Sequence, residues 1–356
     1  MHWTGFARLI VPLWGLASAT SSSISEQDVA AHVIYSYAGL EPPAHLFDLI
    51  RQGKVGGIII FGENVNASLP ATMQLFQDAY TEGTGRSGFP LLTMTDQEGG
   101  EVRRLSGGPE LSAKEIGSAA NPAQTAEDAG TVAGRLLREY NFNTNLAPVV
   151  DVFQSPANFL NAFNRSFSDS PEVVQTCAER FIAGEAAENV LSAAKHFPGL
   201  GGAGEANTDN EPVTIESDWE TLQNVDMQPY QHLIAAEVPM IMCSWAIYPA
   251  VDADRPAGLS SKWIKDTLRG QMGFKGVTIT DAIEAGSLAR FGNDAQRGVL
   301  AAQAGMDLLL ASGRNATQGE AIVDALMAAL QDGTLDAEEF DAATGRISKL
   351  RKGITV

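Results

Sequence analysis

Short apolar runs alternate with longer helical segments along most of this chain. The apolar runs, which we expect to form strands, cover residues 55–61, 90–95, 145–150, 191–195, 239–244, 276–280 and 306–311. The segments expected to be helical cover 25–36, 44–52, 69–82, 125–140, 171–189, 261–271 and 295–304, with a further helix before 239 and two near the C-terminus. Regular alternation of strand and helix is typical of α/β proteins.

Most of the expected strands are nearly continuous apolar runs, such as V-G-G-I-I-I-F at 55–61. Strands of this kind are buried on both faces, which favours a parallel sheet. Seven to eight strand–helix units within roughly 330 residues fit a single-domain (β/α)8 barrel of the TIM type, with irregular first strands, better than an open sheet. No G-x-G-x-x-G follows the first strand, which argues against a dinucleotide-binding fold, and no shift in composition marks a second domain.

The N-terminus has the pattern of a secretory signal. Arg8 precedes a short apolar run at 9–16, and Ala17-Ser18-Ala19 is typical of a signal peptidase site. We therefore expect residues 1–19 to be a signal peptide, residues 20–356 to form the barrel, and the protein to be secreted. The apolar run is too short to span a bilayer, and no later segment is long and apolar enough to do so.

The net charge and the glycosylation motifs agree with a secreted protein. The formal net charge is −19, which excludes a nucleic-acid or anionic-membrane partner because phosphate binding needs a basic face. Asn66, Asn164 and Asn315 each begin an N-x-S/T sequon and would be glycosylated in a eukaryotic secretory pathway. Cys177 and Cys243 either pair or remain two buried thiols. The sequence makes no prediction of oligomeric state.

Polar side chains follow the expected strands at the points where those strands end. They are Asp96, Asp151, the pair Lys195-His196, Ser244-Trp245 and Asp281. In a barrel the carboxyl ends of the strands meet at one rim, where active sites lie. One or two such residues are readily explained as helix caps, but five positions converging on one rim indicate a site.

The residue types at this rim suit carbohydrate chemistry. Asp281 is rigidly held by its strand and can act as a nucleophile, although a helix N-cap is the alternative. Lys195 can donate to sugar hydroxyls or form a salt bridge, and Asp96 can accept two hydroxyls. Arg103, Arg104 and Arg165 can hold a polar ligand, whereas Glu98 has a structural reading beside its glycine turn. A rigid carboxylate facing a second carboxylate on a loop favours glycoside hydrolysis, which needs two such groups flanking one bond.

Five motifs in order resemble glycoside hydrolase family 3, most closely its single-domain β-N-acetylglucosaminidases. They are D-Q-E-G-G-E-V-R-R (96–104), N-L-A-P-V-V-D-V (145–152), N-R-S-F-S (164–168), K-H-F-P-G-L-G (195–201) and L-R-G-Q-M-G-F-K-G-V-T-I-T-D (268–281). The resemblance covers nearly all of the chain after the signal. It implies a TIM-type barrel and a retaining mechanism without metal or cofactor.

The resemblance also assigns residues. It implies that Asp281 is the nucleophile. The non-reducing-end sugar would be bound by Asp96, Arg104, Arg165, Lys195 and His196. The two-domain β-glucosidases of the family usually have Trp after the nucleophile, whereas this chain has Ala282 and no room for a second domain.

One loop departs from the better-known pattern. Where related enzymes carry D-S-H, with an Asp–His pair as acid/base, this chain has Asn207-Thr208-Asp209 and no histidine before His232. N-T-D resembles an actinobacterial-type variant of the same branch. We therefore expect Asp209 to be the acid/base, with Glu211 and then Glu205 as the next candidates, since a carboxylic acid with a raised pKa can do this work.

A second departure is Trp245, which stands near a position where the family often has His. It either stacks on the apolar face of the sugar or packs beneath the rim. The expected function is a secreted exo-β-N-acetylglucosaminidase acting on chitooligosaccharides or cell-wall fragments. The alternatives are another retaining exo-β-glycosidase such as a β-glucosidase, a Schiff-base lyase using Lys195, and a carbohydrate-binding pseudoenzyme without an effective acid/base.

Overall fold

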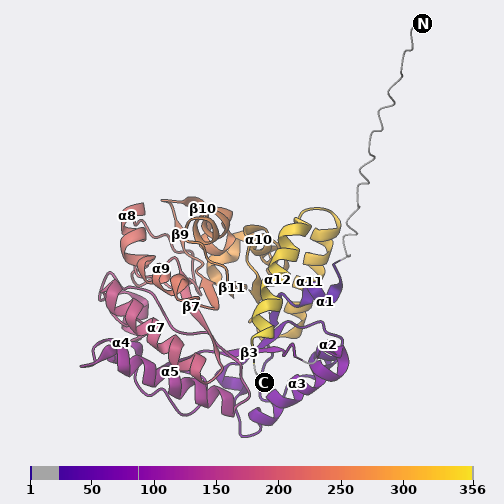
Figure 1. The fold of residues 1–356 in the computed structure, drawn as a ribbon, viewed down its shortest axis with the longest axis horizontal. Coiled ribbons are helices and arrows are strands. Elements are labelled where there is room, and N and C mark those ends of the chain that lie inside the picture. Colours follow the sequence, from indigo (N-terminus) through magenta and orange to yellow (C-terminus); the bar gives the residue numbers. More distant parts are fainter. Residues whose placement is uncertain (2–23, 87, 355–356) are drawn as a thin grey trace.

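Eight parallel strands close into a barrel in the computed structural model (Figure 1), which describes Met1, residues 24–86 and residues 88–354. The barrel order is β1-β12-β11-β8-β7-β6-β3-β2. The strand bounds are β1 (Val33–Tyr35), β2 (Gly57–Ile59), β3 (Leu92–Thr95), β6 (Thr144–Asn145), β7 (Leu191–Phe197), β8 (Met240–Cys243), β11 (Val277–Ala282) and β12 (Leu308–Leu310). The predicted α/β barrel is confirmed.

Helices surround this barrel on the outside (Figure 1). The α-helices are α1 (Glu26–Ala30), α2 (Ala44–Arg51), α3 (Leu69–Thr84), α4 (Ala113–Gly117), α5 (Pro122–Glu139), α6 (Phe159–Ala162), α7 (Pro171–Ala187), α8 (Trp219–Thr221), α9 (Gln228–Ala235), α10 (Asp294–Ala304), α11 (Ala316–Gln331) and α12 (Ala337–Lys352). Shorter 3-10 helices are η1 (Gly62–Asn64), η3 (Ala257–Leu259) and η5 (Gly286–Phe291), and π-helices are η2 (Leu222–Asp226) and η4 (Lys262–Gln271).

Two small antiparallel hairpins stand outside the barrel. One pairs β4 (Gln97–Gly99) with β5 (Val102–Arg103), directly after β3. The other pairs β9 (Ile247–Tyr248) with β10 (Asp252–Pro256), after β8. Because both follow barrel strands at their carboxyl ends, both build up the same rim of the molecule.

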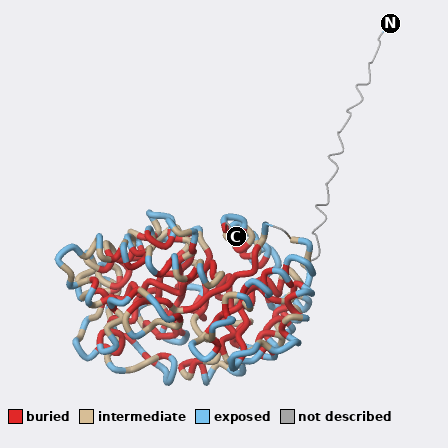
Figure 2. The backbone as a smooth tube through the Cα atoms, turned by 90° about the horizontal axis from the view of Figure 1, so that it is seen from below, coloured by how far each residue is buried: buried red, intermediate tan, exposed pale blue. Residues whose placement is uncertain are grey.

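The hydrophobic interior has two layers, because successive side chains of a strand point to opposite faces. On β8, Met240 and Met242 point into the barrel, whereas Ile241 and Cys243 point outward toward the helices. Figure 2 shows the buried residues running through the interior, with exposed residues on the outer segments. The inner layer fills the barrel, so that the open space for a ligand lies at the rim.

The first part of the chain differs from the prediction. The helix expected over 25–36 ends at Ala30, and β1 begins at Val33. The segment Val33-Ile34-Tyr35 is wholly buried, and its β-branched and aromatic side chains favour a strand once parallel partners exist on both sides. The strand expected over 145–150 is also shorter, since regular pairing in β6 ends at Asn145.

Further predictions from the sequence concern the two cysteines, the N-terminal segment and membrane-spanning helices. Cys177 and Cys243 are both free and buried, so the disulfide alternative is wrong. The expected signal peptide at 1–19 lies outside the described residues. Within the described part of the chain, no helix combines the length and the apolar character needed to span a membrane.

Candidate active site

A cavity of about 540 Å³ opens at the rim formed by the carboxyl ends of the barrel strands. Its lining includes seven of the residues singled out from the sequence: Asp96, Arg104, Arg165, Lys195, His196, Asp209 and Asp281. They come from four different strand ends and loops, separated by up to 185 positions in sequence (281 − 96). Several of the polar residues predicted at the strand ends therefore line one shared cavity.

One side of the cavity is a network of buried charges around Lys195. The Lys195 ammonium lies 2.7 Å from Asp96 Oδ1 and 2.7 Å from Glu98 Oε1. Arg165 donates two hydrogen bonds to Glu98, from Nε at 2.9 Å and from Nη2 at 2.8 Å. Arg104 adds a longer contact of 3.5 Å to Asp96. Glu98, which had a structural reading in the sequence, is thus the residue that joins Arg165 to Lys195.

The charges of this network fix its protonation. Burial alone would raise the pKa of Asp96, but Lys195 and Arg104 hold that pKa below its ordinary value. Burial acts in the same direction on Glu98, whose pKa is held well below its usual range by Arg165 and Lys195. Burial would lower the pKa of Lys195, yet Asp96 and Glu98 raise it. All of these groups are therefore charged at neutral pH and present rigid donors and acceptors to a polar ligand.

A second buried pair orients His196. Asp151 is fully buried, and its Oδ2 atom lies 2.8 Å from His196 Nδ1. Its Oδ1 atom accepts from the backbone amides of Leu200 at 2.6 Å and His196 at 3.3 Å. Because a carboxylate can only accept, Nδ1 of the ring carries the proton and Nε2 is left for the cavity. Asp151 therefore lies behind the cavity wall and positions a residue that lines it.

Asp281 lies near the carboxyl end of β11 and lines the same cavity. Its Oδ1 atom accepts a hydrogen bond of 2.7 Å from the Ala282 amide. Burial raises the pKa of Asp281, the positive charge of His196 opposes this, and the negative charge of Asp209 raises the pKa further. The Asp209 carboxyl group is thus close enough to Asp281 to contribute to the raised pKa of Asp281.

Asp209 comes from the long segment between β7 and α8. It is exposed and lines the cavity, and its backbone amide donates to Asn207 Oδ1 at 2.9 Å. Glu205 and Glu211 are also exposed but fall outside the lining that the described residues form. Of the three carboxylates considered as acid/base, Asp209 is the one that lines the cavity together with Asp281.

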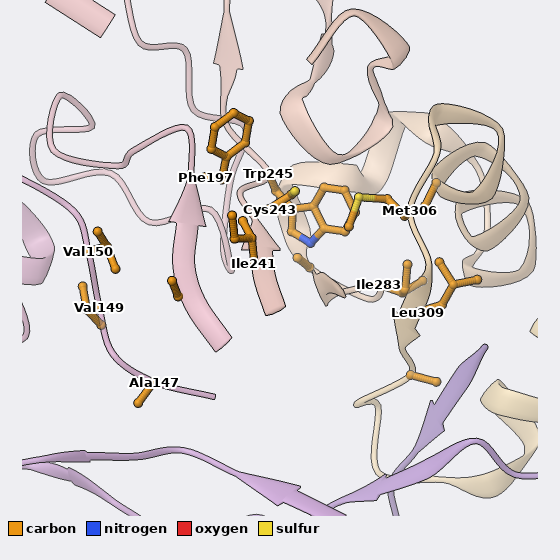
Figure 3. Close-up of a cluster of buried hydrophobic side chains, with 14 of the residues drawn as sticks. Ala147, Val149, Val150, Phe197, Ile241, Cys243, Trp245, Ile283, Met306 and Leu309 are labelled. Carbon is orange, nitrogen blue, oxygen red and sulfur yellow. The ribbon is translucent and has the colours of Figure 1, made fainter. Parts of the chain in front are cut away.

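Trp245 does not have the place that a stacking role requires. It is 1% exposed and lies in the buried hydrophobic cluster with Phe197, Cys243 and Ile283 (Figure 3). Its Nε1 atom donates to the backbone oxygen of Ala282 at 2.8 Å. The stacking alternative is therefore wrong, and Trp245 packs beneath the rim while supporting the backbone next to Asp281.

Part of the cavity lining was not predicted from the sequence. Glu63, Glu284, Ser312 and Arg314 also line the cavity, and Arg314 lies 3.1 Å from Glu63. The strand-end signal was available for two of these segments, because Gly62-Glu63 follows β2 and Ser312-Gly313-Arg314 follows β12. The strands expected over 55–61 and 306–311 end directly before these segments, but the strand-end rule was not applied to them.

A parallel barrel with a rim cavity that contains two carboxyl groups and a network of polar donors is typical of a glycoside hydrolase. The family model described as "Glycosyl hydrolase family 3 N terminal domain" matches residues 29–350. The chain therefore belongs to glycosyl hydrolase family 3, and it is a glycoside hydrolase.

Individual relatives agree with this assignment. A protein of Arthroderma benhamiae named "Uncharacterized secreted glycosyl hydrolase" is 51% identical over 325 residues, which cover 91% of this chain and 92% of the relative. The structure of a β-N-acetylhexosaminidase from Beutenbergia cavernae superposes with a TM-score of 0.81 at 34% identity, covering 92% of this chain and 98% of the other. A family 3 β-N-acetylglucosaminidase of a Paenibacillus species gives a TM-score of 0.86 at 32% identity, and the match covers 92% of this chain and 62% of that longer chain.

Proposed function

We propose that this protein is a secreted, retaining exo-β-N-acetylglucosaminidase that removes terminal β-linked N-acetylglucosamine from chitooligosaccharides or cell-wall fragments. The observation that carries the proposal is the presence of Asp281 and Asp209 in one cavity, facing a network of charged groups suited to sugar hydroxyls. The names of the structural relatives support N-acetylglucosamine as the sugar.

In the first step, the Asp281 carboxylate attacks the anomeric carbon of the bound sugar. The bond from that carbon to the leaving oxygen breaks, and the Asp209 carboxylic acid donates its proton to this oxygen. The products are a glycosyl–Asp281 ester, an Asp209 carboxylate and a free acceptor. Asp96, Arg104, Arg165, Lys195 and His196 hold the sugar that becomes attached.

In the second step, the roles of Asp209 reverse. Its carboxylate takes a proton from water, and the resulting hydroxide attacks the anomeric carbon. The bond to Asp281 breaks, so that the sugar leaves with its original β configuration and both carboxyl groups return to their starting states. No metal or cofactor enters this scheme.

The substrate is tested with paired para-nitrophenyl glycosides of N-acetylglucosamine and glucose, and with chitobiose. We expect the N-acetylglucosaminide to be preferred and chitobiose to be cleaved to monosaccharide. A higher kcat/KM for the glucoside would instead identify a β-glucosidase. Turnover of neither glycoside would favour a carbohydrate-binding protein.

The roles of the two carboxylates are tested separately. Asp281→Ala should abolish turnover of all glycosides. Asp209→Ala should lower kcat/KM for chitobiose by roughly 10²- to 10⁴-fold, the usual contribution of a general acid. It should lower the value for a dinitrophenyl glycoside far less, because that leaving group needs little protonation. Glu211→Gln is the matched control and should leave both values near wild type.

We also propose that residues 1–19 are removed on secretion. The word "secreted" in the name of the Arthroderma relative supports this destination. The mass of the protein recovered from the medium of a eukaryotic host measures both the new N-terminus and the glycans at Asn66, Asn164 and Asn315.

A further inference from the structure

The segment that carries Asp209 is bonded directly to the segment that follows the nucleophile. The Gly286 amide donates to the backbone oxygen of Asp209 at 2.8 Å. The next amide, that of Ser287, donates to the backbone oxygen of Thr208 at 3.2 Å. Gly286 begins η5, five residues after Asp281. The two catalytic carboxyl groups therefore lie on segments that are held together by backbone hydrogen bonds.

Gly286 has no side chain at the point where these segments are closest. A Cβ atom on Gly286 would clash with the backbone oxygen of Asn210 and would lie 2.6 Å from its carbonyl carbon. Both atoms are backbone, so no side-chain rotation would relieve the contact. The φ angle of Gly286 is not in the left-handed region, and an L-residue can therefore adopt its own backbone conformation there. A glycine is therefore required at position 286 by the close approach of the Asn210 backbone, and not by its own φ angle.

The turn that Gly286 contacts is compact. The backbone oxygen of Asn207 accepts from the amides of Asn210 at 3.0 Å and Glu211 at 3.2 Å, and Asn207 Oδ1 accepts from the Asp209 amide at 2.9 Å. These hydrogen bonds hold residues 207–211 together as one turn. A displacement of Asn210 would therefore also displace Asp209. Thr208 beside it is 2% exposed and anchors the turn against the molecule.

We propose that Gly286 is a positioning residue that sets the placement of the acid/base Asp209 relative to the nucleophile Asp281. This inference rests on the roles proposed above for the two carboxylates. A side chain at position 286 displaces the turn 207–211 while Asp281, on β11, keeps its place. The substitution would impair proton transfer to the leaving group and spare attack by the nucleophile.

The test is Gly286→Ala, measured with chitobiose and with the dinitrophenyl glycoside of N-acetylglucosamine. We expect kcat/KM for chitobiose to fall about ten-fold or more, and that for the dinitrophenyl glycoside to stay within about two-fold, because only the first needs a proton at the leaving oxygen. In the pH profile of kcat/KM for chitobiose, the limb that is due to ionisation of the general acid should also become weaker. Gly345→Ala is the matched control, since a Cβ there meets nothing within 4 Å, and it should leave both constants unchanged.

Azide provides a readout that a general loss of structure would not produce. When the base cannot activate water, azide can attack the glycosyl–Asp281 ester without deprotonation. We expect Gly286→Ala to be accelerated by azide with the dinitrophenyl substrate and to form β-glycosyl azide, as Asp209→Ala should, whereas wild type and Gly345→Ala should not respond.

Each outcome has a distinct meaning. Equal losses on both substrates for Gly286→Ala, or kinetics unchanged from wild type, would overturn the positioning role. If Asp209→Ala itself shows no dependence on the leaving group, the proposed function fails instead. If Gly286→Ala lacks the circular dichroism spectrum of the folded protein, the positioning role is also overturned, because the side chain at 286 then disturbs the whole fold and not the turn 207–211 alone.

Discussion

At the scale of single residues, the charged groups that line the cavity differ in burial and in ion pairing. Lys195 and Glu98 are buried and Arg165 is half-buried, and all three are ion-paired, so their charges are already compensated before a ligand arrives. Asp209 is exposed on a turn, where it can meet both a leaving oxygen and water. Breaking one partner of a buried pair leaves an uncompensated charge, and we therefore assign Glu98 to holding Arg165 and Lys195 in place.

The negative charge of Asp209 should decide between water and phosphate as the attacking group. Phosphate is an anion and would be repelled by a carboxylate beside the anomeric carbon, whereas water is neutral. We predict that phosphate causes no sugar 1-phosphate to form. Product analysis in phosphate and in a non-phosphate buffer of equal pH and ionic strength measures this. Accumulation of N-acetylglucosamine 1-phosphate would contradict the prediction.

At the scale of elements, an aromatic cluster supports the start of the segment between β7 and α8 that carries Asp209. Trp263 of η4 is fully buried, with its ring centroid 5.9 Å from that of Phe197 at the end of β7 and 5.4 Å from that of Tyr248 on β9. The Tyr248 hydroxyl donates to the backbone oxygen of Gly199 at 2.8 Å. The cluster thus links two strands to the residues where the segment leaves the barrel.

Truncating this cluster should destabilise the protein. We predict that Trp263→Ala lowers the free energy of unfolding by about 3–5 kcal/mol, the usual cost of removing a buried aromatic side chain. Trp263→Phe should cost clearly less, because the indole Nε1 atom has no hydrogen-bond partner among the described residues. Chemical denaturation of the three proteins measures both values, and equal losses in the two variants would contradict the packing argument.

Another element-scale feature is a buried carboxyl group between α7 and the barrel. Glu185 accepts from Asn145 Nδ2 and Ser192 Oγ, and Asn145 in turn bonds to the backbone of Gln97, between Asp96 and Glu98. Burial raises the pKa of Glu185 from 4.5 to about 8, although these hydrogen bonds oppose the shift. Glu185 therefore joins helix α7 to the segment that carries the sugar-binding carboxylates.

The raised pKa predicts a pH dependence of stability. Because the folded state binds the Glu185 proton more tightly than the unfolded state, this group makes folding less favourable as pH rises from about 4.5 to about 8. Glu185→Gln mimics the protonated acid. It should therefore remove the part of the pH-dependent loss of folding stability that is due to Glu185. Thermal unfolding of both proteins at pH 5 and pH 8 measures it, and an identical decline in wild type and variant would show that Glu185 does not contribute.

At the scale of the whole molecule, the regular alternation of strands and helices was sufficient to predict the barrel. The convergence of Asp96, Lys195, His196 and Asp281 followed from topology, because parallel strands in a barrel place their carboxyl ends on one rim. β1 was missed since three buried residues, Val33–Tyr35, form a strand through partners that are distant in sequence on both sides, in β2 and in β12. Such pairing leaves no local periodicity to detect.

Other parts of the site depend on side-chain contacts that one sequence does not contain. The ion pairs of Glu98 with Arg165 and Lys195 join residues 67 and 97 positions apart (165 − 98 and 195 − 98). The place of Trp245 depended on which face of a short segment was buried, and the local pattern Cys243-Ser244-Trp245 allowed both alternatives. Asp209 was distinguished from Glu205 and Glu211 by its place in the lining of the cavity.

The central claim is that Asp281 forms a covalent bond to the sugar. It is tested most directly by treating the protein with a ring-fluorinated N-acetylglucosaminyl donor that has an activated leaving group, followed by mass spectrometry of the intact and digested protein. The account predicts an added mass of one glycosyl residue, located on Asp281, and no adduct in Asp281→Ala. An adduct on another carboxylate, or turnover that releases the α-anomer without any adduct, would contradict it.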